Sequence, residues 1–239
     1  MWGRVRETGP TSWPRTPDEL AREQERLASL GAEPWEPGRA PLRIGACAVV
    51  SGRAGLDGTG WAAAVVDVGG ALSRACTAVS RIEAPFRPGL LALREGPALE
   101  AVVRGLEPRP DVLLVAASGR DHPLGAGLAL HLGAVLDVPT VGVTDGPLVA
   151  SGGEPPEPAG SLAPLRVGGQ VVAYRVRTRA GAKPIVAHAA WRTSAEVAAR
   201  VVLACTALAR WPRPLREARR LAREARSGDA QPGRSQPPP

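Results

Sequence analysis

The chain has 239 residues, of which 44% are hydrophobic, so it is long enough to bury a core of its own. Its net charge is +7, and Lys183 is its only lysine, so the basic residues are otherwise arginine, which suits contacts with phosphate. No apolar run is long enough to span a membrane, and three cysteines without a CxxC pair exclude a disulfide framework and a zinc motif of that kind. The N-terminus has no apolar stretch typical of a signal peptide, so we expect a cytoplasmic protein.

The first part of the chain predicts a helix, a linker and three strands. Residues 17–31 carry apolar residues at helical spacing, with Asp18 in the first turn and Gly31 as the expected C-terminal cap. A linker over 32–41 follows. Apolar runs separated by turns then predict neighbouring strands over 42–50, 60–69 and 76–84.

The remainder of the chain alternates between helical and strand patterns. The continuous apolar run over 111–118 is typical of a parallel strand that is covered on both faces. We expect further strands over 139–144 and 183–190, a hairpin that turns at Gly168–Gly169, and helices over 90–106, 125–137, 194–209 and 213–226. The proline-rich tail over 227–239 has no apolar anchors and is expected to be disordered.

Three strands in a meander, followed by alternating helices and strands, predict an α/β protein with a mixed sheet flanked by helices. This order is the one expected of a ribonuclease H-like fold, although flavodoxin-like orders also fit the second half. We expect a single domain over residues 1–226.

Three segments resemble, in order and spacing, the endonuclease V family: PFRPGLLALREGPAL, PDVLLVAASGRDHPLGAGLALHLGAVLDVPTVGV and VRTRAGAKPIVAHAAWRTSAE. The similarity covers roughly residues 17–224. It implies a ribonuclease H-like fold and cleavage of DNA or RNA near deaminated adenine (inosine), with Mg²⁺ held by carboxylates.

The resemblance also implies a set of metal-binding positions, from which this chain departs. Glu95 matches the glutamate of the family's Arg-Glu-Gly-Pro motif, but Cys47 and Ala116 stand where the family has aspartates. Arg219 stands where the closing helix usually has an aspartate or a histidine. Mg²⁺ prefers oxygen ligands, whereas a thiol is a soft ligand and alanine is none. The catalytic metal site is therefore expected to be degraded, which puts Mg²⁺ binding in doubt.

Other positions of the family's motifs are partly kept. His122 matches the histidine of a His-Pro step, whereas Ser118 replaces a histidine and Asp145 replaces a lysine. A loop resembles the wedge with which the family probes a damaged base; its residues here are Pro85, Phe86, Pro88 and Gly89.

Most of these residues have two possible roles. Glu95 could be a metal ligand, or it could cap its helix, bond to backbone amides or pair with Arg94 or Arg219. Asp121 could replace a lost oxygen donor, and His122 could bind a base or phosphate or simply anchor its loop. Phe86 could stack on a base or pack against the sheet, and Cys47 could be a reactive or a buried thiol. Asp145 could be a loop residue or a helix cap. The arginines of helix 213–226 could follow the phosphates of a strand or form a solvated face. His131, inside an apolar helix, is expected in the core.

These observations favour a monomeric endonuclease V-like protein that binds DNA or RNA. We expect it to have retained nucleic-acid binding while its cleavage activity is weak or lost. One alternative is an active Mg²⁺-dependent endonuclease with a rebuilt ligand set. Another is a protein-interaction module that reuses the fold. The sequence leaves DNA and RNA both open as partners.

Overall fold

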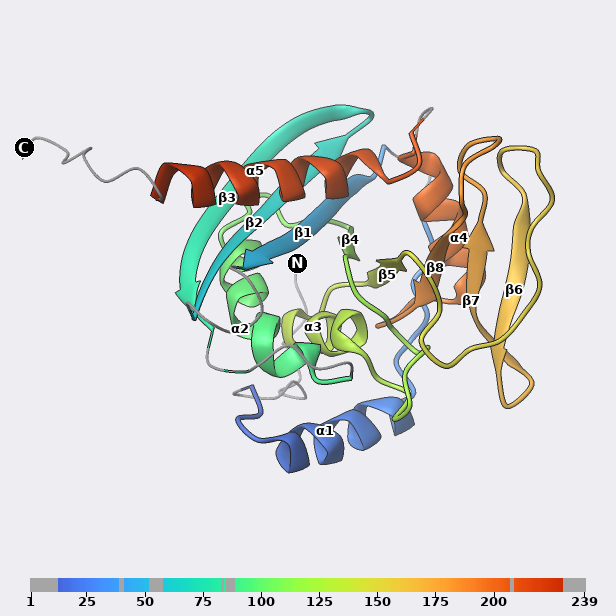
Figure 1. The fold of residues 1–239 in the computed structure, drawn as a ribbon, viewed down its shortest axis with the longest axis horizontal. Coiled ribbons are helices and arrows are strands. Elements are labelled where there is room, and N and C mark those ends of the chain that lie inside the picture. The colour runs from blue at the N-terminus through green and yellow to red at the C-terminus, as the bar shows by residue number, and fades with distance from the viewer. Residues whose placement is uncertain are drawn as a thin grey trace, which may run out of the picture.

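The computed structural model describes residues 13–38, 41–51, 58–82, 84, 89–206 and 209–229. Within them, one sheet of eight strands has the order β3-β2-β1-β4-β5-β8-β7-β6 (Figure 1). The strands are β1 Arg43–Ser51, β2 Thr59–Val68, β3 Ala71–Arg81, β4 Val112–Val115, β5 Thr140–Thr144, β6 Leu162–Val167, β7 Gln170–Val176 and β8 Ile185–Ala189. The helices are α1 Pro17–Ser29, α2 Leu91–Arg104, α3 Leu128–Leu136, α4 Ala195–Ala204 and α5 Arg213–Asp229.

The sheet is mixed. β1, β2 and β3 form the predicted antiparallel meander, and β1, β4 and β5 run parallel at its centre. β8 pairs antiparallel with β5, and the β6–β7 hairpin extends that edge. All four residues of β4 are buried, as expected for a parallel strand covered on both faces.

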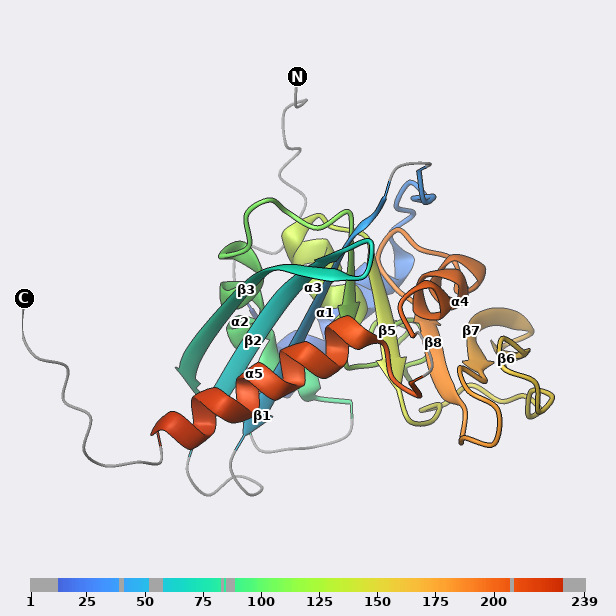
Figure 2. The ribbon, with the colours of Figure 1, turned by 90° about the horizontal axis from the view of Figure 1, so that it is seen from above.

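Helices cover both faces of the sheet. α1, α2 and α3 lie on one face, and α4 and α5 lie on the other, where α5 crosses β1, β2 and β3 (Figures 1 and 2). Because side chains alternate along a strand, Cys47 belongs to the core under α2 and α3, whereas Ala46 and Ala48 belong to the core under α4 and α5. His131 is fully buried and stacks on Trp13, with ring centroids 4.4 Å apart, which confirms its place in the core.

The third strand starts earlier than the sequence pattern predicts, at Ala71 instead of residue 76. Gly69 and Gly70 both have positive φ, at 58° and 88°. A two-residue turn of this kind matches the twist of the flanking strands, so pairing between β2 and β3 begins directly after it.

Two helix ends also differ from the predictions. The chain leaves α1 at Leu30 in an extended conformation (φ −70°, ψ 122°), so Gly31 is not the left-handed cap that the pattern suggested. The start of α1 is capped by Thr16, whose side chain accepts a hydrogen bond from the amide of Glu19. α5 continues to Asp229, so the first residues of the predicted disordered tail are helical, and the rest of that tail lies outside the described residues.

In the described part of the chain, no helix is long and apolar enough to cross a membrane. The three cysteines are all free thiols.

Candidate functional site

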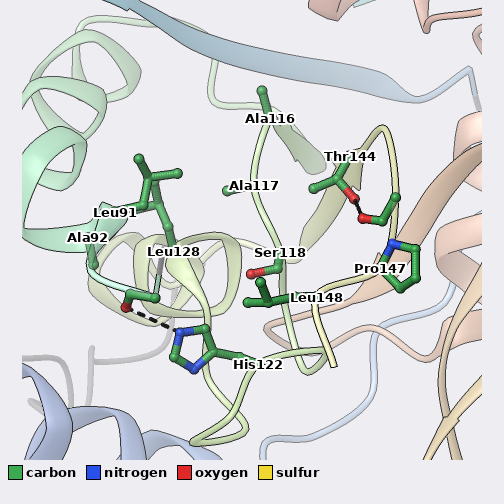
Figure 3. Close-up of a pocket in the computed structure, with 12 residues that line it drawn as sticks. Leu91, Ala92, Ala116, Ala117, Ser118, His122, Leu128, Thr144, Pro147 and Leu148 are labelled. Atoms are coloured by element: carbon green, nitrogen blue, oxygen red, sulfur yellow. Dashed lines mark hydrogen bonds between the residues drawn. The ribbon is translucent and has the colours of Figure 1, made fainter. Parts of the chain in front are cut away.

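A pocket of about 240 Å³ opens at the carboxyl ends of β4 and β5. In sheets of this kind the carboxyl ends of parallel strands are the usual place for a ligand. Most of the lining is apolar, with the hydroxyls of Ser118 and Thr144 and the ring of His122 as the polar side chains (Figure 3). The lining residues are Gly89, Leu91, Ala92, Ala116, Ala117, Ser118, His122, Leu128, Thr144, Gly146, Pro147 and Leu148.

The segment after β4 lies against its neighbours because glycines leave room for it. A Cβ on Gly142 would lie 2.4 Å from the carbonyl oxygen of Ala117, and one on Gly119 would lie 2.1 Å from that of Ala189. The strand predicted over 111–118 therefore ends at Val115, and the three residues that follow it line the pocket instead.

His122 anchors the loops at one side of the pocket. Its Nδ1 accepts a hydrogen bond from the amide of Leu124 at 3.2 Å, so the proton of the neutral ring lies on Nε2 and points at the carbonyl oxygen of Gly89, 3.2 Å away (Figure 3). Burial lowers the pKa of the ring. Because both nitrogens bond to backbone, the geometry favours loop anchoring over contact with a base or a phosphate.

Asp121 organises the opposite rim. Its carboxylate is fully buried and accepts hydrogen bonds from three successive amides, those of Leu148, Val149 and Ala150, at 2.7–2.8 Å. Its oxygens are thus committed to the backbone of the turn that carries Pro147 and Leu148. This geometry favours a structural role for Asp121 in supporting that turn.

A buried histidine lies under the same turn. The hydroxyl of Thr144 donates to the carbonyl oxygen of Gly146 at 2.6 Å, so it accepts from Nε2 of His188 at 2.7 Å. The remaining nitrogen of His188, Nδ1, lies 3.5 Å from the Asp121 carboxylate. Burial lowers the pKa of His188 to about 4, although Asp121 acts in the opposite direction.

Glu95 lies one turn into α2, which begins at Leu91, so it does not cap the helix. It is half-buried, and it makes no hydrogen bond and no ion pair with any residue that the structure describes. Arg94, its neighbour, donates instead to the carbonyl oxygen of Ala84 and to the hydroxyl of Ser51. Burial raises the pKa of Glu95 to about 7, against the opposing charges of Arg94 and Arg219. The expected backbone or salt-bridge partners of Glu95 are thus not found among the described residues.

Cys47 is fully buried, and burial, helped by the nearby charge of Glu95, raises its thiol pKa far above the usual range. Full burial and a raised pKa disfavour the thiolate, which is the nucleophilic form of cysteine. The structure therefore favours the buried-thiol role of Cys47 over the reactive one.

Arg219 projects from α5, and its guanidinium carbon lies over the ring of Trp211, 4.0 Å from the ring centroid. Burial lowers its pKa, and Asp145 and Glu95 are the acidic groups within electrostatic reach. Asp145 itself pairs with Arg210, at 2.7 Å. Asp145 is therefore a loop residue held by an ion pair, and the structure joins Arg219 to no carboxylate in the described residues.

Sequence reasoning missed several residues of this region. Gln24 is almost fully buried, and its side-chain amide lies 3.4 Å from His122 and 3.5 Å from the Gly89 oxygen. A polar residue within the apolar stripe that Leu20 and Leu27 define was a usable signal. Thr144, His188 and Trp211 gave none, because their partners are distant in the chain. Pro85, Phe86 and Pro88 lie outside the described residues, whereas Gly89 lines the pocket with φ at 81°.

The mixed eight-stranded sheet, with helices on both faces and a pocket at the ends of its central parallel strands, defines an α/β protein of the ribonuclease H-like class. Solved structures support this class. The crystal structure of endonuclease V from Streptomyces avermitilis superposes with a TM-score of 0.83 at 32% identity, covering 93% of this chain and 98% of that one. Human endonuclease V superposes with a TM-score of 0.80 at 28% identity, covering 90% and 100%.

The sequence profile of the endonuclease V family matches residues 47–220. Endonuclease V from Streptomyces coelicolor is 35% identical over 219 residues, which are 90% of this chain and 93% of that protein. The match to endonuclease V from Methanopyrus kandleri is 44% identical but spans only 61% of this chain and 62% of that protein. The chain belongs to the endonuclease V family, whose members are metal-dependent, inosine-directed nucleases that typically use Mg²⁺.

The donors around Glu95 do not fit that metal. Mg²⁺ requires near-octahedral oxygen ligands, usually with one or two carboxylates. The described residues bring no three of His, Cys, Asp and Glu together in a way that could hold a metal ion. Within electrostatic reach of Glu95 lie the buried thiol of Cys47 and the positive charges of Arg94 and Arg219.

Replacing Glu95 by glutamine is expected to stabilise the protein at pH 8 and to change little at pH 5. The pKa of Glu95 in the fold, about 7, lies above its ordinary value of 4.5, so the folded state holds the proton more tightly. The stability that this provides is complete below pH 4.5 and is lost as the pH rises through 7. Glutamine cannot ionise, so thermal melting at pH 8 should show a gain of about 1–3 kcal/mol.

Glu25→Gln is the matched control, because Glu25 is an exposed helical glutamate whose replacement should change stability little. Millimolar Mg²⁺ should leave the melting temperature of the parent unchanged, since bound metal would raise it. A Mg²⁺-dependent rise that Glu95→Gln abolishes would instead show that Glu95 holds a metal.

Proposed function

We propose that this protein binds single-stranded nucleic acid, with one base inserted in the pocket, and that it cleaves the strand weakly or not at all. One observation supports this proposal above all. The largely apolar pocket is present, but Cys47 and Ala116 stand where the family has acidic residues. A base can bury its faces against apolar side chains, and here Leu91, Leu128 and Leu148 supply such side chains. Hydrolysis of a phosphodiester needs charge stabilisation that Cys47 and Ala116 do not provide.

Charge supports the same proposal. The chain has a net charge of +7, with arginine as nearly all of its basic residues. Arginine binds phosphate through a planar set of donors, and neutralising phosphates releases counterions from the strand. Family membership makes inosine the first base to test, in DNA and in RNA.

The test combines binding and cleavage on single- and double-stranded oligonucleotides that carry one inosine, with Mg²⁺ and with Mn²⁺. We expect binding to single strands that weakens by about tenfold between roughly 50 and 200 mM salt, as for three phosphate contacts, with no cleavage. Cleavage with either metal would favour an active enzyme with a rebuilt ligand set. A flat salt response, or no binding at low salt, would favour a protein-interaction module.

The pocket is tested separately by filling it. A Cβ on Gly146, which lines the pocket, meets open space, and so does one on Gly153, which is not among the pocket residues. Gly146→Trp should therefore block the base and weaken binding by about tenfold, the order of one lost base stack, whereas Gly153→Trp should not. Equal affinities for the two variants would contradict insertion of a base.

A further inference from the structure

The exposed part of α5 has two flanks of different character. One flank carries Arg220 between Glu217 and Glu224. The guanidinium of Arg220 donates hydrogen bonds to both carboxylates, at 2.9 and 2.6 Å. The other flank, which we call the arginine flank, carries arginines at spacings of three, four and three residues and therefore on one side of the helix. Its members are Arg216, Arg219, Arg223 and Arg226.

The arginine flank is poor in acidic partners. Arg216, Arg219 and Arg223 make no side-chain hydrogen bond or ion pair with the part of the chain that the structure describes. Arg226 reaches the carbonyl oxygen of Ser51, at 3.5 Å, and lies over Trp61. The arginine flank thus runs from the carboxyl end of β1, at Ser51, toward the region of Glu95 and Asp145.

Arg219 is the member whose charge lies within electrostatic reach of Asp145, a residue of the turn that lines the pocket. Asp145, which is within its electrostatic reach, lies between Thr144 and Gly146, and both of these residues line the pocket. Ala116, another pocket residue, packs against the same core cluster as Trp211, the residue on which Arg219 lies. Trp211, beneath Arg219, and Ala116 thus border one core cluster, and the charge of Asp145, in the turn that lines the pocket, reaches Arg219.

The surroundings of Arg219 leave its donors available. The guanidinium carbon of Arg219 lies over the Trp211 ring, 4.0 Å from its centroid, and the N–H groups of Arg219 make no hydrogen bond or ion pair with the described residues. Arg210 holds the exposed carboxylate of Asp145 at 2.7 Å, so that carboxylate is already paired. A planar guanidinium with free edges is suited to two parallel bonds with a phosphate.

We propose that Arg219 binds directly, without a metal ion, the phosphate of the nucleotide whose base enters the pocket, and that Arg216 and Arg223 contact the neighbouring phosphates of the same strand. This proposal rests on the proposed function and assigns the chemical group that this position of α5 recognises. The ligand is a nucleoside phosphate, and the guanidinium supplies the positive charge.

The experiment compares Arg219→Gln with Arg220→Gln, which remove the same charge from adjacent positions of one helix. Binding is measured for a single-stranded inosine oligonucleotide, and for inosine and its 5′-monophosphate, each with EDTA and again with Mg²⁺ in place of EDTA. Arg219→Gln should weaken oligonucleotide binding about tenfold or more, the usual effect of losing a charged hydrogen bond, and reduce the salt slope by about 0.7. Arg220→Gln should change affinity less than threefold, because Glu217 and Glu224 already neutralise it.

The parent should bind the monophosphate more tightly than inosine, and Arg219→Gln should lose that preference. Arg219→Lys keeps the charge without the planar donors, so it should restore only part of the affinity. Arg219→Lys also replaces Arg219→Gln in the binding assay if Arg219→Gln is unfolded at the assay temperature. Equal losses for Arg219→Gln and Arg220→Gln, with the parent still binding, would overturn the assignment of Arg219 alone. No binding by the parent would overturn the proposed function as well, and binding that EDTA abolishes would show that a metal holds the phosphate.

Discussion

Replacing Asp121 by alanine is expected to destabilise the fold by about 3–5 kcal/mol, the usual effect of removing one partner from a buried, charged hydrogen-bond network. The carboxylate is fully buried and accepts three backbone amides, of Leu148, Val149 and Ala150. Without it these N–H groups lose their acceptors, and the turn that forms the pocket rim loses its support. Chemical unfolding measures the effect on stability, and the binding assay measures the effect on the pocket.

Asp145→Ala is the matched control. Asp145 lies at the start of the same turn, but its side chain is 66% exposed and its partner is Arg210, so its removal should cost less than about 1 kcal/mol. The loss of stability in Asp121→Asn should fall between those of the two alanine variants. The asparagine oxygen still accepts hydrogen bonds from backbone amides, and the NH₂ group can donate to Nδ1 of His188, which lies 3.5 Å from the present carboxylate. If alanine at the two positions had the same small effect, Asp121 would not be the support of the rim.

Restoring acidic residues around Glu95 is expected to make the protein depend on metal. In the triple variant Cys47→Asp, Ala116→Asp, Arg219→Asp, carboxylates gather near Glu95 and the positive charge of Arg219 is lost. Position 47 is fully buried, so an unpaired carboxylate there is costly, and without metal the variant should melt well below the parent. Mg²⁺ or Mn²⁺ at one hundred times its dissociation constant should raise the free energy of unfolding of the triple variant by about 2.7 kcal/mol.

Adding Glu95→Gln to the triple variant removes one ligand and should reduce this rescue. Cys47→Asp with Ala116→Asp, which keeps Arg219, is the milder variant if the triple variant does not fold. Cleavage need not return, because Ser118 and Asp145 still differ from the family's motifs. The measurement is the melting temperature of the parent and of each variant, with and without each metal. A parent that responds to metal as strongly as the triple variant would mean that Glu95 already has its partners.

The sequence by itself determined the family and the class of fold. Family motifs are short strings with fixed spacing, so Glu95 and His122 could be placed, and Cys47, Ala116 and Arg219 identified as replacements, before any contact was known. Apolar periodicity likewise predicted the meander, the central parallel strands and the helices. These features depend on near neighbours in the chain. Element ends were less certain, because the turn at Gly69–Gly70 and the close approach of Ala117 to Gly142 depend on pairing between strands.

Only the tertiary structure decided what each site residue does. Asp121 looked like a spare oxygen donor, but a turn 27–29 residues further along the chain places three amides on its carboxylate. Glu95 looked like a paired residue, but the fold buries it without a partner among the described residues and raises its pKa. The sequence identified Arg219 only as the replacement of a metal-binding residue, whereas the fold places its guanidinium over the ring of Trp211. Hydrogen bonding, desolvation and charge act over a few ångströms in space, and folding alone brings such distant residues within that range.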